Sequence, residues 1–474
     1  MSTQQRLTSD ELADVFSSNA AKDEKVGIEV ENGLVDPVTG CSIPYDGQRS
    51  ARSLLEAIVK ELSGDALYVD DVNDKDIIGV QLPNGAKFTL ETGGALEYAS
   101  DASVGLAEAV DNTREDLLQA AAIAERLGIA LLSGACLPFT PRNQIPWIPK
   151  PRVQVMLNYF SRLGEPGMYA EEVMGLTLST QTSLDYVSGP DFIKKMRLHV
   201  LAAPIVAALF VNSPIAEGGD FGGMSRRMQY WRNFDPRRCG VLGFALKENV
   251  SVQDIVDWAI ELPMIYRHVE GTPEHVHEAA PNHSFADLMR YGFGDDTWPT
   301  SEDFGLHLCQ LWPHVRPRRG TLELRASDGL PWPYFSAAPA IWVGLTYDPE
   351  IRRQATAYLS DLTARQLEGA VDDIATIGLK TSIGNHEVKE LARELLRLAR
   401  CGLQKRVDAS IDPYEVLSYL EPLEQVSESE ETFAEKCAAS WEYELERSPE
   451  AYVEKYRVPF KLQVDLGLLI IHFK

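Results

Sequence analysis

Apolar and acidic residues alternate over residues 26–31, which read Val-Gly-Ile-Glu-Val-Glu. A period of two is typical of a β-strand with two different faces. Ile28 and Val30 are expected to face a core, while Glu29 and Glu31 lie about 6.7 Å apart on the other face. At an effective dielectric constant of about 20, the two carboxylates would repel each other by roughly 2.5 kcal/mol. In open water that repulsion nearly vanishes, so the stretch alone is more typical of a solvated sheet edge.

The same two-faced pattern recurs three more times along the chain. Glu91 and Glu97 again stand beside apolar neighbours, and the alternation returns over residues 175–186 and 321–327. In the last stretch Glu323 and Arg325 share one face. Strands with apolar backs and acidic or amide fronts predict an α+β fold, in which helices cover the apolar face of one antiparallel sheet. The other face is then left as a polar concavity.

Helical periodicity and turn signals place the remaining elements. The hairpin signal Asn84-Gly85 separates two predicted strands. Proline-rich residues 134–151 indicate a long loop, and acidic residues 425–432 indicate a mobile connector. Predicted helices cover residues 54–62, 104–127, 191–210, 351–367 and 386–403. We expect a polar N-terminal extension (1–25), a catalytic body (26–405) and a mostly helical C-terminal appendage (406–474).

Charge and cysteine usage exclude several classes of function. The formal net charge of -25 argues against nucleic acid or an anionic membrane surface as a partner. No apolar run reaches the roughly 18 residues that span a bilayer, and residues 466–473 are expected to pack on the body. Six scattered cysteines without Cys-x-x-Cys spacing indicate neither a zinc site nor a disulfide framework. We therefore expect a reduced, cytoplasmic protein.

Five glutamates would share the polar face of the predicted sheet. They cannot all stay ionised at neutral pH without cations. Because histidine and cysteine are absent from the set, its hard oxygen ligands suit Mg²⁺ or Mn²⁺ rather than zinc. A magnesium site of this kind usually serves bound phosphate, most simply that of ATP. The predicted metal ligands are Glu29, Glu31, Glu91, Glu97 and Glu323.

Arginines follow a glycine-rich stretch within residues 212–240. The glycines form neither a Rossmann nor a Walker fingerprint and, taken alone, are turn residues. In so acidic a chain, Arg227 and Arg238 favour recognition of carboxylate or phosphate. A second basic cluster, Arg316, Arg318 and Arg319, directly precedes the Glu323 strand.

Together these residues resemble the glutamate–cysteine ligases of the plant and proteobacterial type and their actinobacterial relatives of the ergothioneine pathway. The resemblance implies a fold similar to glutamine synthetase and guanido kinases, in which a curved antiparallel sheet forms a funnel for two or three magnesium ions. It implies phosphorylation of the γ-carboxylate of glutamate by ATP, followed by attack of the cysteine amine. The motifs run in family order between residues 26 and 405: 27–31, 91–97, Gln181 with Asp185, 212–214, Ser225 with Arg227, Trp231, Asp235, Arg238 with Gly240, and 323–325 with Asp328.

The resemblance also implies roles for individual residues. The five glutamates would be metal ligands, and Glu323, Gln181 and Arg325 would form the catalytic set. Arg325 would stabilise the transferring phosphoryl group, and Gln181 would hold a metal or the substrate amine. The substrate carboxylates of glutamate or cysteine would be bound by Ser225, Arg227, Trp231 and Arg238.

Two positions depart from the family pattern and bear on the identity of the amine. Ser183 stands where many relatives have asparagine, and Ala95 stands where plant members have glutamine. Three hypotheses follow: a glutamate–cysteine ligase, a ligase of the same chemistry with a different amine, or a non-catalytic binding relative. The complete carboxylate set weighs against the third. The expected partners are small-molecule substrates, and the expected assembly is a monomer or a homodimer.

Overall fold

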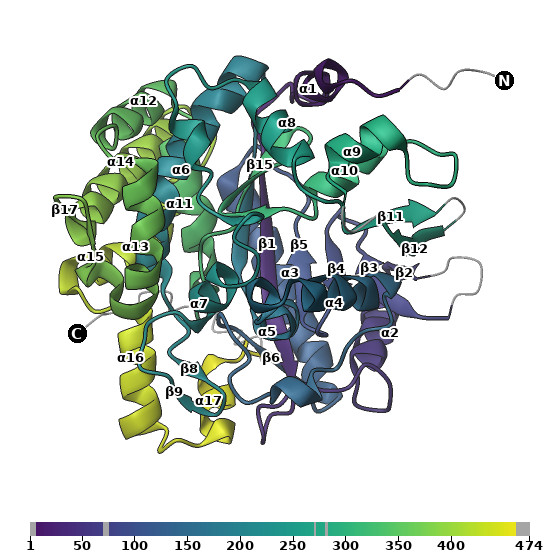
Figure 1. Cartoon of the computed structure of the whole chain (residues 1–474). Helices are drawn as coiled ribbons and strands as arrows, with labels where there is room; N and C mark the ends of the chain where they lie inside the picture. The colour runs from purple at the N-terminus through teal and green to yellow at the C-terminus, as the bar shows by residue number, and fades with distance from the viewer. Residues whose placement is uncertain (1–5, 70–74, 270–271, 280–282, 461–474) are drawn as a thin grey trace.

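An antiparallel sheet organises the computed structural model, which describes residues 6–69, 75–269, 272–279 and 283–460. In the described part, nine strands belong to it, and β1 crosses the middle of the molecule (Figure 1). Along the sheet the order is β14 (Val315–Pro317), β15 (Thr321–Leu324), β7 (Thr180–Asp185), β1 (Val26–Val35), β5 (Leu96–Ala99), β4 (Lys87–Leu90), β3 (Ile77–Gln81) and β2 (Asp65–Tyr68). The ninth strand, β6 (Ala130–Leu132), also pairs with β1. The predicted α+β class with an antiparallel sheet is confirmed.

The strand register places the predicted polar residues on one face. Glu29 is paired with Gln181 of β7, and Glu31 is paired with Glu97 of β5. On the opposite face, Ile28 is buried, as the alternation predicts. The helices α3 (Leu106–Arg126), α6 (Gly189–Phe210) and α11 (Ala337–Thr346) contact the strands and contribute to this core. The polar face is therefore the one that remains for a site.

The other elements surround this body, with the C-terminal helices gathered to one side of β1 (Figure 1). Short strand pairs are β8 (Ile215–Ala216) with β9 (Gly219–Asp220), β10 (Cys239–Gly240) with β13 (Trp312–Pro313), β11 (Tyr266–Val269) with β12 (Thr272–Glu278), and β16 (Ser382–Ile383) with β17 (His386–Glu387). The remaining α-helices are α1 (Ser9–Ser18), α2 (Ala51–Leu62), α4 (Pro151–Leu163), α5 (Ala170–Leu176), α7 (Arg226–Arg232), α8 (Val252–Ile260), α9 (Phe285–Tyr291), α10 (Ser301–Leu308), α12 (Pro349–Tyr358), α13 (Ala364–Ile377), α14 (Val388–Asp408), α15 (Glu421–Ser429), α16 (Phe433–Ala439) and α17 (Pro449–Tyr456).

Two predicted segments are wrong in their secondary structure. The single helix over 351–367 is two helices, because the side chain of Thr363 accepts a hydrogen bond from Gln366 and starts α13 with a capping box. The connector over 425–432 is largely helix α15, because Leu423 and Val426 are fully buried and tie it to the core. Its acidic residues had suggested mobility, but they only mark the outer face of the helix.

The strand predicted from residue 175 begins only at Thr180, since Gly175 and Leu176 belong to α5. A Cβ on Gly93 would collide with the backbone of Gly175, so the turn after Glu91 depends on this close approach. The alternation fails only at Gly175 and Leu176, since Thr177 and Ser179 already form isolated β-bridges and Leu178 is buried. Its practical consequence is that α5 fixes the turn that carries Glu91.

Helix α1 and residues on both sides of position 405 join the same core as the sheet. Leu12 and Phe16 of α1 are fully buried, and α14 runs without a break through residue 405. Leu420, beyond that position, is also in the core. The apolar stretch 466–473 lies outside the described residues. Among those described, no helix is both long and apolar enough to cross a membrane.

Candidate active site

A cavity of about 370 Å³ opens on the polar face of the sheet. One side of it, here called the acidic wall, consists of Glu29, Glu31, Glu91 and Glu97. Another part of the lining, here called the basic wall, consists of Arg227, Arg316, Arg318 and Arg325. Four of the five predicted metal ligands therefore meet in one cavity, which four arginines also line.

The carboxyl groups of the acidic wall are buried and affect one another's pKa. Burial, followed by the charge of Glu323, raises the pKa of Glu29 to about 7. Burial and then Glu91 raise the pKa of Glu31 to about 7 as well. The pKa of Glu97 is raised well above its usual value by burial and by Glu91, although Thr89 donates a hydrogen bond to it at 3.1 Å. These carboxyl groups would carry their full negative charge only beside a cation.

The carboxylate oxygens of the acidic wall are ligands that suit a hard divalent cation, but their spacing limits how many can bind one ion. In the described residues, no three Asp, Glu, His or Cys side chains are grouped closely enough to hold a metal ion between them. Mg²⁺ typically takes only one or two protein carboxylates and completes its shell with phosphate oxygens and water. The acidic wall therefore fits a metal ion that shares its coordination with a bound phosphate.

Gln181 connects the two walls through hydrogen bonds. Its Nε2 donates to Oε1 of Glu31 at 3.2 Å, and its Oε1 accepts from Nη1 of Arg325 at 2.5 Å. Ser179 donates to the other oxygen of Glu31 at 2.9 Å. Gln181 thus fixes the distance between a predicted metal ligand and the arginine predicted to stabilise the phosphoryl group.

Glu323 lies behind the basic wall, not on the cavity surface. Its carboxylate is fully buried and accepts hydrogen bonds from Arg316 (2.6, 2.7 and 3.1 Å), Arg318 (2.8 Å) and Arg325. Burial alone would raise its pKa, but the guanidinium groups, Arg316 first, hold the pKa of Glu323 well below its usual range. The ligand role predicted for Glu323 thus requires that an arginine release one of its oxygens.

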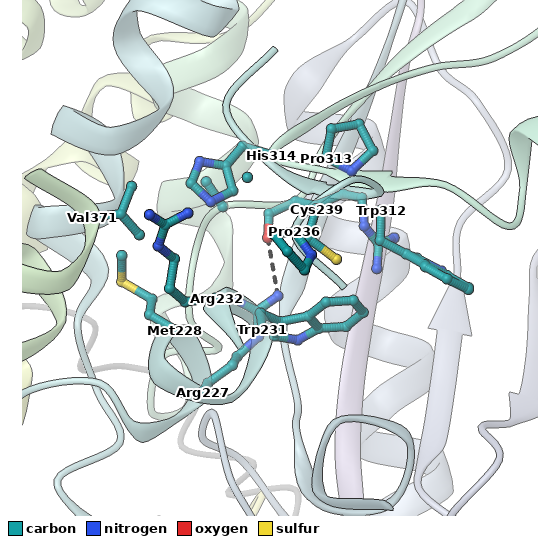
Figure 2. A pocket seen from close by; sticks show the side chains of 13 residues that line it. Arg227, Met228, Trp231, Arg232, Pro236, Cys239, Trp312, Pro313, His314 and Val371 are labelled. Atoms are coloured by element: carbon teal, nitrogen blue, oxygen red, sulfur yellow. Dashed lines mark hydrogen bonds between the residues drawn. The ribbon is translucent and has the colours of Figure 1, made fainter. Parts of the chain in front are cut away.

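Two donors on helix α7 lack a partner among the described residues. Nε of Arg227 and Nε1 of Trp231 are buried and make no hydrogen bond, and both residues line the cavity. They stand one helical turn apart and also line a second cavity of about 30 Å³, where Figure 2 shows them across from His314. Nη2 of Arg227 donates to the carbonyl oxygen of Arg325 at 3.0 Å. This pair of free donors is suited to a carboxylate.

Two predicted substrate-binding residues, Ser225 and Arg238, do not line the cavity. Arg238 is fully buried, and its guanidinium is used by Asp235 (3.1 Å), Gln310 (3.3 Å), Tyr159 (2.7 Å) and Pro263 (2.5 Å). Ser225 caps helix α7, where its hydroxyl accepts from the backbone of Met228 at 3.1 Å. Both residues shape the protein around the cavity without lining it.

Sequence reasoning left Arg316 and Arg318 without a role. The hairpin between β14 and β15 pairs Arg316 directly with Glu323, and Gly320 turns the chain with φ at 83°. Reading residues 315–324 as a hairpin could have found this pairing. Arg152, Thr92 and Cys309 also line the cavity, but no local pattern indicated them.

Comparison with known proteins shows the family of the chain. The profile of the glutamate-cysteine ligase family 2 matches residues 25–450. The chain is 30% identical over 448 residues to glutamate–cysteine ligase B, chloroplastic, of Oryza sativa subsp. japonica, covering 93% of this chain and 86% of the relative. It is 30% identical over 453 residues to the chloroplastic enzyme of Nicotiana tabacum, covering 95% and 83%. A glutamate–cysteine ligase of Francisella tularensis in complex with AMP aligns with a TM-score of 0.49 and 13% identity, over 94% of this chain and 91% of that one. The chain belongs to the glutamate–cysteine ligase family.

Proposed function

We propose that this chain joins the γ-carboxylate of L-glutamate to the amine of L-cysteine at the expense of ATP. The observation that carries the proposal is a single cavity lined by both the acidic and the basic wall, in a member of this family. Carboxylates on one wall suit the cations that accompany ATP, and arginines on the other suit its phosphates. The funnel shape of the sheet and its likeness to glutamine synthetase belong to the same proposal.

The reaction divides into two displacements. A γ-carboxylate oxygen of glutamate attacks the γ-phosphorus of ATP, which gives γ-glutamyl phosphate and releases ADP. The cysteine amine then attacks the acyl carbon, loses a proton and expels phosphate. Arg325, on the basic wall, stabilises the charge on the transferring phosphoryl group, and Gln181 holds Arg325 in place.

Divalent metal ions, Mg²⁺ or Mn²⁺, would be held by Glu29, Glu31, Glu91 and Glu97. Glu323 would join them as a ligand once an arginine releases one of its oxygens. When bound, such an ion neutralises charge on phosphate oxygens. Glutamate is expected to place its γ-carboxylate between the walls, beside Arg325.

The free donors of α7 form a binding site, here called the carboxylate grip, for an amino-acid α-carboxylate. Nε of Arg227 and Nε1 of Trp231 can donate to its two oxygens, replacing the hydrogen bonds it loses on leaving water. Asp328, whose Oδ1 lies 3.6 Å from Nη1 of Arg227, is placed to hold the guanidinium. This grip supports two substrates that are both α-amino acids.

A panel of amines tests the proposal. The protein is incubated with Mg·ATP, glutamate and either cysteine, 2-aminobutyrate, or an amine without a carboxylate, and the products are weighed by mass spectrometry. We expect cysteine to give the highest kcat/KM, with 2-aminobutyrate about 10–200-fold lower, because the thiol adds only a small apolar contact. If an amine without a carboxylate outperforms cysteine, the acceptor is wrong and the ligase serves a different amine.

A further inference from the structure

The three arginines around Glu323 hold it to different degrees. Arg316 makes three contacts with its carboxylate, donates from Nη1 to the carbonyl of Cys309 at 3.1 Å, and has a side chain only 9% exposed. Arg318 donates one hydrogen bond to Oε2 at 2.8 Å and one to Sγ of Cys309 at 3.7 Å, and its side chain is 36% exposed. Arg325 also donates once to Glu323, but it is bound to Gln181 as well and its side chain is only 12% exposed. Arg318 is therefore the most exposed of the three arginines, and the one that can turn away from Glu323 toward the cavity most readily.

Arg318 also acts on a second carboxylate, Glu29 of the acidic wall. Glu29 on β1 and Glu323 on β15 flank the same strand, β7, where Gln181 and the short Ser183 are their pairing partners. After burial, Glu323 is the main cause that raises the pKa of Glu29, and Arg318 is the main cause that lowers it. The guanidinium of Arg318 thus supplies positive charge to two carboxylates that repel each other.

We propose that Arg318 is a resident counter-ion, which exchanges with a divalent cation when a polyphosphate enters the cavity. The phosphate takes the guanidinium of Arg318, and the cation carried by the phosphate takes its place between Glu29 and Glu323. The exchange leaves no charge unpaired, because Arg318 passes to the phosphate while the two carboxylates pass to the cation. It rests on the proposed function in that the polyphosphate is that of ATP.

This exchange makes one metal position depend on the nucleotide. Oε2 of Glu323 accepts from Arg316 and Arg318, so the departure of Arg318 frees a lone pair on that oxygen for a metal ion. Arg316 remains and keeps Glu323 in place. The role of Glu323 as a metal ligand is then compatible with its burial behind the basic wall.

Counting bound Mn²⁺ by electron paramagnetic resonance tests the exchange. The wild-type protein is titrated with Mn²⁺, with and without a non-hydrolysable ATP analogue that has an imido group between the β- and γ-phosphorus atoms. Arg318→Met removes the charge and keeps the bulk, so we expect it to bind without nucleotide an additional Mn²⁺ that the wild type binds at least about tenfold more weakly. The control is Arg319→Met, which changes the same charge at the exposed neighbouring residue.

Two results would overturn the exchange. One is that Arg318→Met and the wild type bind the same number of Mn²⁺ ions, with equal affinity, without nucleotide. The other is that Glu323→Gln, if it folds, binds as many Mn²⁺ ions as the wild type in the presence of the analogue; if it does not fold, Arg318→Met decides alone. A protein that shows the expected Mn²⁺ counts but forms no γ-glutamyl product would retain the exchange and reject the proposed function.

Discussion

Glu31 and Glu97 are paired directly across strands β1 and β5, on the polar face of the sheet. Like charges opposite each other destabilise a sheet, so this pair lowers stability unless the charge is neutralised. Proton uptake or a cation can do this, and both are open to measurement. Repulsion between these two carboxylates therefore destabilises the sheet at the place where the proposed metal ions bind.

We predict that the metal-free protein loses stability as the pH rises. Burial, and then Glu91, raise the pKa of Glu31 to about 7, above the roughly 4.3 of an unfolded chain. Between those values the folded state binds more protons than the unfolded state, so the free energy of unfolding falls with rising pH. In EDTA, Tm should fall between about pH 5 and about pH 8, and Glu31→Gln should lessen the fall. Added Mg²⁺ should restore Tm in the wild type; an unchanged pH slope in the variant would contradict the assignment.

We predict that Trp231→Phe weakens substrate binding more than it slows the chemistry. The variant keeps an aromatic ring but removes the Nε1 donor, and a hydrogen bond to a charged group contributes about 1.5–3 kcal/mol. The KM for one of the two amino acids should rise at least about tenfold while kcat changes little. Trp258→Phe, on helix α8, is the matched control and should leave both constants as they are. Equal KM values for Trp231→Phe and the wild type would remove Trp231 from the carboxylate grip.

Arg325→Lys is expected to lower kcat with little change in the KM for ATP. Lysine keeps the charge but cannot reach Gln181, Glu323 and a phosphoryl group at once, as the guanidinium can. Loss of a preorganised donor to developing charge typically costs about 10²–10³-fold. Steady-state kinetics at varied ATP checks this. A pure rise in KM would show that Arg325 only binds ATP.

Arg238→Lys should destabilise the protein without changing the KM of either amino acid. The four hydrogen-bonding partners of Arg238 are all protein groups, and disrupting a buried ion pair costs about 3–5 kcal/mol. Urea unfolding should show the loss, while Arg237→Lys, at the exposed neighbour, should not. A selective rise in the KM of one amino acid, at unchanged stability, would return Arg238 to the substrate site.

Sequence alone predicted the acidic wall because strand alternation is local. Glu29 and Glu31 needed only the period of two, and the recurrence of the pattern predicted that Glu91 and Glu97 would join them. That the guanidinium of Arg238 is bound by protein groups could not be predicted, because Tyr159 and Pro263 come from distant parts of the chain. The contacts of Glu323 with three arginines were not predicted for a different reason, namely that the hairpin pairing it with Arg316 was not recognised.

The most direct test of the account follows the oxygen that leaves glutamate. The protein is supplied with Mg·ATP, cysteine and glutamate whose γ-carboxylate is labelled with oxygen-18, and the released phosphate and nucleotide are analysed by mass spectrometry. If the carboxylate attacks the γ-phosphorus, the nucleotide product is ADP, and each phosphate carries one labelled oxygen from glutamate. Unlabelled phosphate, or AMP with pyrophosphate, would contradict the γ-glutamyl phosphate and with it the role given to the two walls.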